Sequence, residues 1–191
     1  MPADSNLEIH MAHYQQGDFN AAAVLIAQLS PQLHRFFLAQ LASRADADDL
    51  LQETWLRIHK VRHTYRPGEP VLPWLYAIAR RVRVDHYRRS IRTTGRQQAM
   101  EDMSEIPATV SAGSGRLDDF SALLAPLSDG EREVIVMLKV EGMSLEEAAR
   151  ATSSTVGSVK QKAHRAYKKL RETMSATRRS GRGTAEDCRE R

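Results

Sequence analysis

Apolar residues recur at helical spacing along most of the chain, while the strict alternation typical of β-strands is scarce. The pattern therefore predicts an all-α protein of two small helical domains joined by a flexible linker. The first domain is expected at 6–92 and the second at 117–175. Between them, residues 93–116 lose the apolar periodicity and gather Ser, Thr, Gly and Pro, which is typical of a linker. The tail, 176–191, has no apolar face and is expected to be disordered.

Breaks in the pattern divide the first domain into helices. Gly17–Asp18 is expected to open one helix and Ser30–Pro31 the next, because short polar residues cap helices and proline fits a first turn. Asp46 is expected to begin a third helix. The segment 66–73 holds three prolines and a glycine and cannot be helix interior. A long basic helix should follow at 74–91.

Two capping-box patterns mark helix starts in the second domain. They pair Ser128 with Glu131 and Ser144 with Glu147. Each pattern precedes a stretch with apolar residues at helical spacing, so each predicts the first turn of a helix.

The second capping box opens a segment with the layout of a helix-turn-helix. A short helix is predicted at Leu145–Ala151, a polar turn at Thr152–Ser154, and a second helix capped by Thr155. One face of the second helix is apolar, formed by Val156, Val159, Ala163, Ala166 and Leu170.

The opposite face of that helix is basic. Between Thr155 and Arg171 there are six Lys or Arg residues and no acid. For an isolated helix of this kind, a solvated outer face is the better explanation. The short capped helix before it favours a helix that enters the major groove of DNA, where Lys and Arg neutralise phosphates and Arg or Gln reads base edges.

The overall composition bears mainly on the cellular compartment of the protein. The net charge is +4, and the single cysteine, Cys188, excludes an intramolecular disulfide and a multi-cysteine metal site. The longest apolar run, Ala21–Ala27, is far too short for a membrane helix, and no secretion signal is visible. We expect a cytoplasmic protein.

Three segments in order resemble the sigma factors of bacterial RNA polymerase, in their minimal extracytoplasmic-function (ECF) form. DADDLLQETWLRIHKV and PWLYAIARRVRVDHYRRS resemble the first sigma domain, and the stretch from LSDGEREV to KKLRE resembles the second. The resemblance covers about 17–92 and 119–172. It implies a non-enzymatic subunit, with no cofactor, that directs core polymerase to stress-response promoters and initiates transcription.

The resemblance also implies roles for individual residues. In the third helix Leu50, Leu51, Trp55 and Ile58 are expected to bury. The residues expected to dock on the clamp helices of the largest polymerase subunit are Asp48, Asp49, Gln52, Glu53 and Arg57. Those expected to bind and melt the proximal promoter element are Tyr65, Arg80, Arg81, Arg88 and Arg89, with Tyr65 stacking on a flipped base. Those expected at the distal element are Lys160, Gln161, His164, Arg165 and Lys168.

Regulation is implied as well. The variant PWLYAIARR suggests a subgroup held by an anti-sigma factor embedded in the membrane, and the linker acids Glu101, Asp102 and Glu105 are expected to mimic nucleic acid within polymerase.

Two other classes of protein fit parts of the pattern. An ordinary helix-turn-helix regulator would not bind core polymerase. A metal enzyme is suggested only by the i, i+4 spacing of His59 and His63, which lacks the glutamate of the HExxH pattern.

Overall fold

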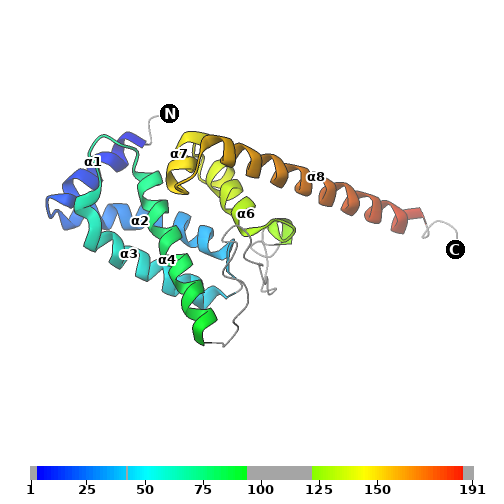
Figure 1. The fold of residues 1–191 in the computed structure, drawn as a ribbon, viewed down its shortest axis with the longest axis horizontal. Coiled ribbons are helices and arrows are strands. Elements are labelled where there is room, and N and C mark those ends of the chain that lie inside the picture. Colours follow the sequence, from blue (N-terminus) through cyan, green and yellow to red (C-terminus); the bar gives the residue numbers. More distant parts are fainter. Residues whose placement is uncertain (1–3, 42, 94–121, 187–191) are drawn as a thin grey trace.

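The computed structural model describes the backbone of residues 4–41, 43–93 and 122–186, which hold helices and turns but no strand (Figure 1). The all-α prediction is confirmed. The first group of helices comprises α1 (Asp4–Gln15), α2 (Phe19–Leu38), α3 (Arg44–Val61), the 3₁₀ turn η1 (Arg62–Thr64) and α4 (Val71–Thr93). The second group comprises α6 (Asp129–Ile135), the π-helical turn η2 (Val136–Val140), α7 (Leu145–Ala151) and α8 (Val156–Glu186).

Helix α2 begins where the sequence predicts but does not end there. The Asp18 carboxylate caps it by accepting hydrogen bonds from the amides of Asn20 (2.8 Å) and Ala21 (3.3 Å). The predicted helix start at Ser30–Pro31 is wrong, because α2 continues through Pro31. Because proline has no amide hydrogen, the carbonyl of Ala27 lacks its helical donor. Ala27 and Pro31 are both exposed, so water can replace that donor. A buried apolar face continues past the proline and holds the helix against the core: Leu25, Leu29, Leu33, Phe36 and Phe37.

Helix α3 starts two residues before the predicted Asp46. Ser43 caps it, and its hydroxyl accepts a hydrogen bond from the Asp46 amide at 3.3 Å. Leu50 and Ile58 are buried as expected, whereas Leu51 and Trp55 are only partly buried. The Trp55 indole reaches the surface of α2, where it donates to the hydroxyl of Ser30 at 2.9 Å.

The predicted caps of the second group are confirmed. The Glu131 carboxylate accepts a hydrogen bond from the Ser128 amide at 3.0 Å. At the start of α7, Ser144 and Glu147 make both hydrogen bonds of a capping box. The Thr155 hydroxyl accepts from the Ser158 amide at 3.1 Å, so that α8 begins at Val156.

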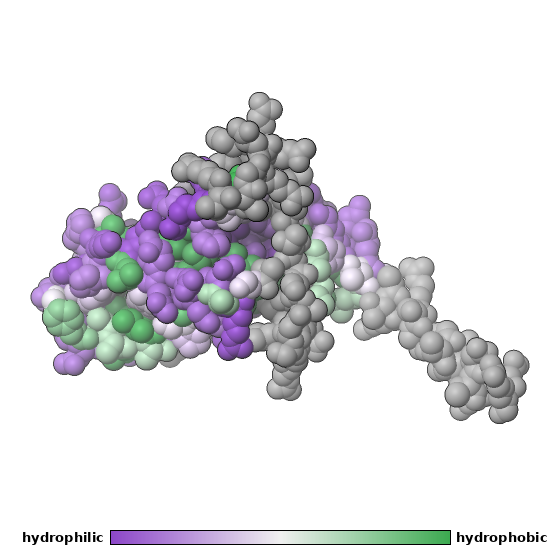
Figure 2. Space-filling model, turned by 90° about the horizontal axis from the view of Figure 1, so that it is seen from below, coloured by the Kyte–Doolittle hydropathy of each residue, from purple (hydrophilic) through white to green (hydrophobic). Residues whose placement is uncertain are grey.

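The two groups of helices touch each other. Helices α1–α4 pack together, α6 and α7 pack against α8, and α4 also packs against α7. Figure 2 shows one face of the molecule, on which hydrophilic residues cover most of the described surface. Helices α2 and α3 expose a few large apolar side chains, among them Phe19, Ile26 and Leu56. In the part of the chain that the structure describes, no helix combines the length and the apolar character needed to cross a membrane.

Helix α8 is the longest element and projects away from the rest of the molecule (Figure 1). It reaches Glu186 and so continues past residue 175, where the pattern predicts the second domain to end. The predicted linker lies outside the described residues, apart from Thr93, and so do Glu101, Asp102, Glu105 and Cys188.

Pro31 provides a test of how α2 tolerates its interior proline. Pro31→Ala should raise the free energy of unfolding by up to about 3 kcal/mol, because alanine restores a helical hydrogen bond and removes the ring's clash with the preceding turn. Urea unfolding followed by circular dichroism measures the change. Pro67→Ala, in the exposed loop before α4, is the control and should bring no gain. A loss of stability in Pro31→Ala would contradict this account of α2.

Candidate nucleic-acid interface

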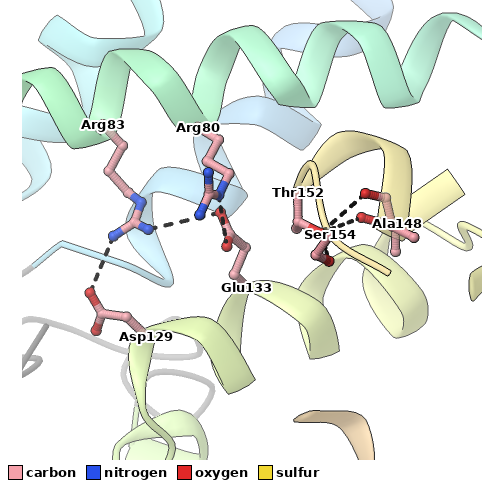
Figure 3. Close-up of polar contacts among 8 residues, drawn as sticks. Arg80, Arg83, Asp129, Glu133, Ala148, Thr152 and Ser154 are labelled. Carbon is pink, nitrogen blue, oxygen red and sulfur yellow. Dashed lines mark hydrogen bonds and ion pairs between the residues drawn. The ribbon is translucent and has the colours of Figure 1, made fainter. Parts of the chain in front are cut away.

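The turn between α7 and α8 is fixed by its own hydrogen bonds (Figure 3). Thr152 is buried, and its hydroxyl donates to the Ala148 carbonyl at 2.8 Å and lies 2.7 Å from the Ser154 hydroxyl. Ser153 takes the left-handed conformation with φ of 51°, a position that usually favours glycine. The turn therefore sets the angle between the two helices, as a helix-turn-helix requires.

Helix α8 has the two faces that the sequence predicts. Val159, Ala163 and Ala166 are buried, and Val156 and Leu170 are packed at the edge of the core. The residues predicted to read the distal element are all exposed: Lys160, Gln161, His164, Arg165 and Lys168. The first four border one surface hollow, so the structure brings them together.

One carboxylate below this face was predicted from the sequence only as part of a helix cap. Glu131 of α6 has a side chain only 4% exposed, and its two oxygens face α8. One oxygen lies 2.8 Å from Nζ of Lys169, and the other lies 3.7 Å from Nε of Arg165. Hydrogen bonds from Lys169 and the Ser128 amide outweigh burial and lower the pKa of the Glu131 carboxyl. Glu131 therefore links the start of α6 to the basic face of α8.

Two arginines of the basic helix α4 form ion pairs with acids of α6. Nε of Arg80 lies 3.2 Å from a Glu133 oxygen, and Arg83 lies 3.2 Å from Asp129 and 3.8 Å from Glu133 (Figure 3). We call these four side chains the Arg–acid cluster. Apart from Arg80, their side chains are 3–7% exposed. Burial raises the pKa of the Asp129 carboxyl, and the neighbouring Arg83 opposes that shift.

The other predicted DNA ligands of α4 point outward. Arg81, Arg88 and Arg89 are exposed, and the Arg89 guanidinium donates to the Asp85 carbonyl at 3.3 Å. The sequence shows six arginines in this helix region but cannot show that two of them, Arg80 and Arg83, meet acids of a distant helix.

Further charged contacts join the two groups of helices. Arg132 is 1% exposed and donates to the carbonyls of Ala39 (3.2 Å), at the end of α2, and Leu127 (3.1 Å). Glu141 follows η2, and its fully buried carboxylate lies 3.8 Å from Arg35 and beside the hydroxyl of Tyr76. Burial raises the pKa of the Glu141 carboxyl, and both neighbours oppose that shift. These contacts join the second group of helices to α2, and at Tyr76 to α4.

The loop before α4 holds Tyr65 in a buried position. Tyr65 is only 3% exposed. Its ring packs edge-on against the Trp74 ring, with 5.6 Å between the ring centroids, and its hydroxyl donates a hydrogen bond to the Glu69 carbonyl. Burial, followed by the charges of Glu8 and Glu69, raises the pKa of Tyr65 to about 12. The ring could stack on a base only after leaving Trp74, so its predicted role stays a prediction.

The residues predicted to bind polymerase occupy exposed or half-exposed positions on α3. They are Asp48, Asp49, Gln52, Glu53 and Arg57. Arg57 bridges to α4, with its guanidinium 2.8 Å from Asp85 and 3.4 Å from Glu53. His59 and His63 were the pair whose spacing suggested a metal site. Among the described residues there is no group of three His, Cys, Asp or Glu side chains placed to bind a metal.

Two family models match the chain. Sigma-70 region 2 matches residues 25–93, and Sigma-70, region 4 matches residues 117–170. The RNA polymerase sigma factor CarQ of Myxococcus xanthus is 32% identical over 172 residues, which cover 86% of this chain and 95% of that protein. The ECF RNA polymerase sigma factor SigF of Caulobacter vibrioides is 31% identical over 173 residues, covering 90% and 95%.

Two solved structures are also similar to this chain. CnrH, in complex with the cytosolic domain of CnrY, has a TM-score of 0.69 at 25% identity, covering 90% of this chain and 98% of CnrH. The sigma factor RpoE of Bartonella quintana, in complex with the anti-sigma factor NepR, has a TM-score of 0.65 at 26% identity, covering 78% and 94%.

The Glu131 contacts predict a pH-dependent stability. Glu131→Gln should lower the free energy of unfolding at pH 7 by roughly 1–3 kcal/mol, because a charge-assisted hydrogen bond to Lys169 is lost. The folded-state pKa of Glu131 lies below its ordinary value of 4.5, so its stabilisation is complete above that pH and is lost as the pH falls through the folded-state pKa. Urea unfolding from pH 7 down to pH 3 should show the two proteins converging. Glu146→Gln, at an exposed position, is the control, and an equally large and pH-dependent loss there would refute the assignment.

Proposed function

The chain belongs to the ECF sigma factors of bacterial RNA polymerase, and from this identity we propose how its surfaces divide the work of promoter recognition. The family match over both helical regions carries the assignment. Like its relatives, the protein directs core polymerase to promoters and initiates transcription. Run-off transcription with purified core polymerase and a promoter of its own regulon tests it directly, and absence of any promoter-specific transcript would contradict it.

We propose that the outer face of α3 docks on the clamp helices of the largest polymerase subunit. Asp49 and Gln52 are exposed there, and Glu53 lies beside them. The Arg57 bridge to Asp85 fixes α3 against α4, so docking would also orient the DNA-binding helix. An ordinary helix-turn-helix regulator would have no use for such a face.

The first domain is proposed to bind and melt the proximal promoter element with α4 and the loop before it. Arg81, Arg88 and Arg89 face outward, and Arg80 would join them once released from Glu133. Basic side chains on one helix neutralise neighbouring phosphates. The loop around Tyr65 would hold the flipped base, which requires the ring to separate from Trp74.

The second domain is proposed to place α8 in the major groove of the distal element. Arg165 is the candidate for guanine, since a guanidinium fork matches the two acceptors on that base. Glu131 supports the assignment, because it lies 3.7 Å from Nε of Arg165 while the Arg165 side chain stays 62% exposed. Lys160 and Lys168 are assigned to phosphates.

The chain itself is proposed to carry no catalytic step, since polymerase forms the phosphodiester bonds, and to act in the cytoplasm where polymerase works. An anti-sigma factor is the expected inhibitor, because RpoE of Bartonella quintana is seen bound to one. That the inhibitor is embedded in the membrane is proposed only from the PWLYAIARR variant.

The docking proposal predicts the effect of reversing charge on α3. The double variant Asp49→Lys, Glu53→Lys should lose core polymerase in a pull-down while keeping its circular dichroism spectrum, since neither side chain is buried. Glu146→Lys, Glu172→Lys reverses two exposed acids of the second domain and should bind as the wild type does. Undiminished capture by the α3 variant would rule out this docking face.

Base reading and phosphate binding predict different losses on α8. Arg165→Ala should relax the preference at one base pair, by roughly 1–3 kcal/mol. Lys168→Ala should weaken binding to all DNA sequences alike and reduce the salt dependence of binding by about one unit of slope. Transcription by each holoenzyme across a library randomised at the distal element separates the two. If Arg165→Ala loses activity evenly with the preferred sequence unchanged, Arg165 is a phosphate ligand.

A further inference from the structure

Helix α1 lies before the residues that the family model matches, and it borders the loop that leads into α4. The match to Sigma-70 region 2 begins at residue 25, whereas α1 ends at Gln15. A buried apolar face of Leu7, Met11 and Tyr14 holds α1 in place, and the helix packs against α2 and also touches η1 and α4 (Figure 1). A helix outside the family match is thus a neighbour of the loop that is proposed to hold the flipped base.

Gln15 of α1 holds the start of this loop by its main chain. The Gln15 side-chain amide donates to the carbonyls of Arg62 and Tyr65, at 2.7 Å each. Because both acceptors are backbone groups, Gln15 fixes the path of the chain at Tyr65 without restricting the torsions of the Tyr65 side chain. The ring can therefore leave Trp74 while the backbone beneath it stays in place.

Glu8 holds the other end of the loop. It lies seven residues before Gln15, a spacing that places both side chains on the same side of α1. One Glu8 oxygen accepts a hydrogen bond from the amide of Val71, the first residue of α4, at 3.2 Å. The first amides of a helix lack an intrahelical acceptor, and Pro70 before this helix has no side-chain oxygen with which to cap it. Glu8 therefore caps α4 from a different helix.

Two further contacts attach α1 to the end of α3 and to η1. The Tyr14 hydroxyl lies 2.8 Å from Nδ1 of His59, and the Arg62 guanidinium lies over the Tyr14 ring, 5.7 Å from its centroid. Between the attachment points, residues 63–64 and 66–69 are exposed. An exposed segment has few packing contacts to keep its shape, so the hydrogen bonds from α1 carry more weight there.

We propose that α1 is a positioning element for promoter melting, in which Gln15 and Glu8 hold the loop in the shape that receives the flipped base. A loop that is ordered before DNA arrives loses less conformational entropy when the base binds, so it captures the base more tightly. Neither residue touches DNA, and both act through the backbone of the loop. The proposal rests on the proposed function, in which this loop holds the base.

The test makes one substitution at two adjacent positions of α1. Gln15→Glu keeps the size of the side chain but removes both donated hydrogen bonds, because a carboxylate only accepts. Gln16→Glu is the matched control, since Gln16 is exposed and the variant gains the same charge one residue away. Each variant is assembled with core polymerase on a promoter of its regulon. Permanganate reactivity of unpaired thymines measures opening, and a gel shift in the cold measures the closed complex.

Gln15→Glu should lower the equilibrium constant for opening by roughly three- to ten-fold relative to Gln16→Glu, as expected for the loss of backbone hydrogen bonds. Affinity in the closed complex should be the same for both, because no base is flipped there. Hydrogen–deuterium exchange of the free chain should show faster exchange of the amides at 63–69 in Gln15→Glu alone. Amides of α2 and α3 should keep their wild-type rates.

Glu8→Ala tests the other end of the loop, and it serves as the test should Gln15→Glu fail to fold. It removes the acceptor of the Val71 amide, so that amide should exchange faster and opening should fall as well. Its closed complex should again keep the affinity of the control.

Opening at the control level in both α1 variants would overturn the positioning role. Faster exchange throughout α1–α4 would also overturn it, because the variants would then act by a general loss of stability. Tyr65→Ala, measured in parallel, tests the proposed function of the loop itself. If Tyr65→Ala lowers opening and the α1 variants do not, only the positioning role is wrong, whereas if none of the three lowers opening, the assignment of the loop fails with it.

Discussion

The contact between α4 and α6 is made by charged groups that are almost entirely removed from water. Arg83, Asp129 and Glu133 can be buried only because each has an opposite charge within 3.8 Å, since an unpaired charge there would be costly. The requirement for pairing fixes where α6 sits along α4. Helix α7 of the helix-turn-helix also packs directly against α4, so both contacts set how the second domain lies against the first.

Helix α6 is short, yet its acids reach two separate partners. Asp129 and Glu133 face α4, and Glu131 faces α8 and meets Arg165 and Lys169. One helical turn therefore both contacts α4 of the first domain and supports Arg165, the proposed base-reading side chain. The capping hydrogen bond that the Ser128 amide donates to Glu131 gives that turn a fixed start, so the three carboxylates keep their directions.

The arrangement leaves only part of the proposed DNA-binding helix exposed. A basic helix exposed in the cell would meet nucleic acid of any sequence, because phosphate contacts carry no sequence information. In this structure Arg80 and Arg83 instead meet the carboxylates of Glu133 and Asp129. Two proteins to which this chain is similar, CnrH and the sigma factor RpoE, were solved in complex with CnrY and with the anti-sigma factor NepR.

The sequence alone determined the class, the caps and the helix-turn-helix, because these depend on residues close together in the chain. Ser144 with Glu147 and Thr155 before α8 act within one turn, and α7 begins and ends at the predicted residues. Pro31 misled the prediction, because its tolerance depends on the packing of α2 on both sides of it. The burial of Tyr65 against Trp74, the pairing of Arg83 with Asp129 and the reach of Glu131 to Lys169 were decided by tertiary structure. The two ion pairs join residues 46 and 38 positions apart, and a local pattern carries no information about which charge will face which across such a separation.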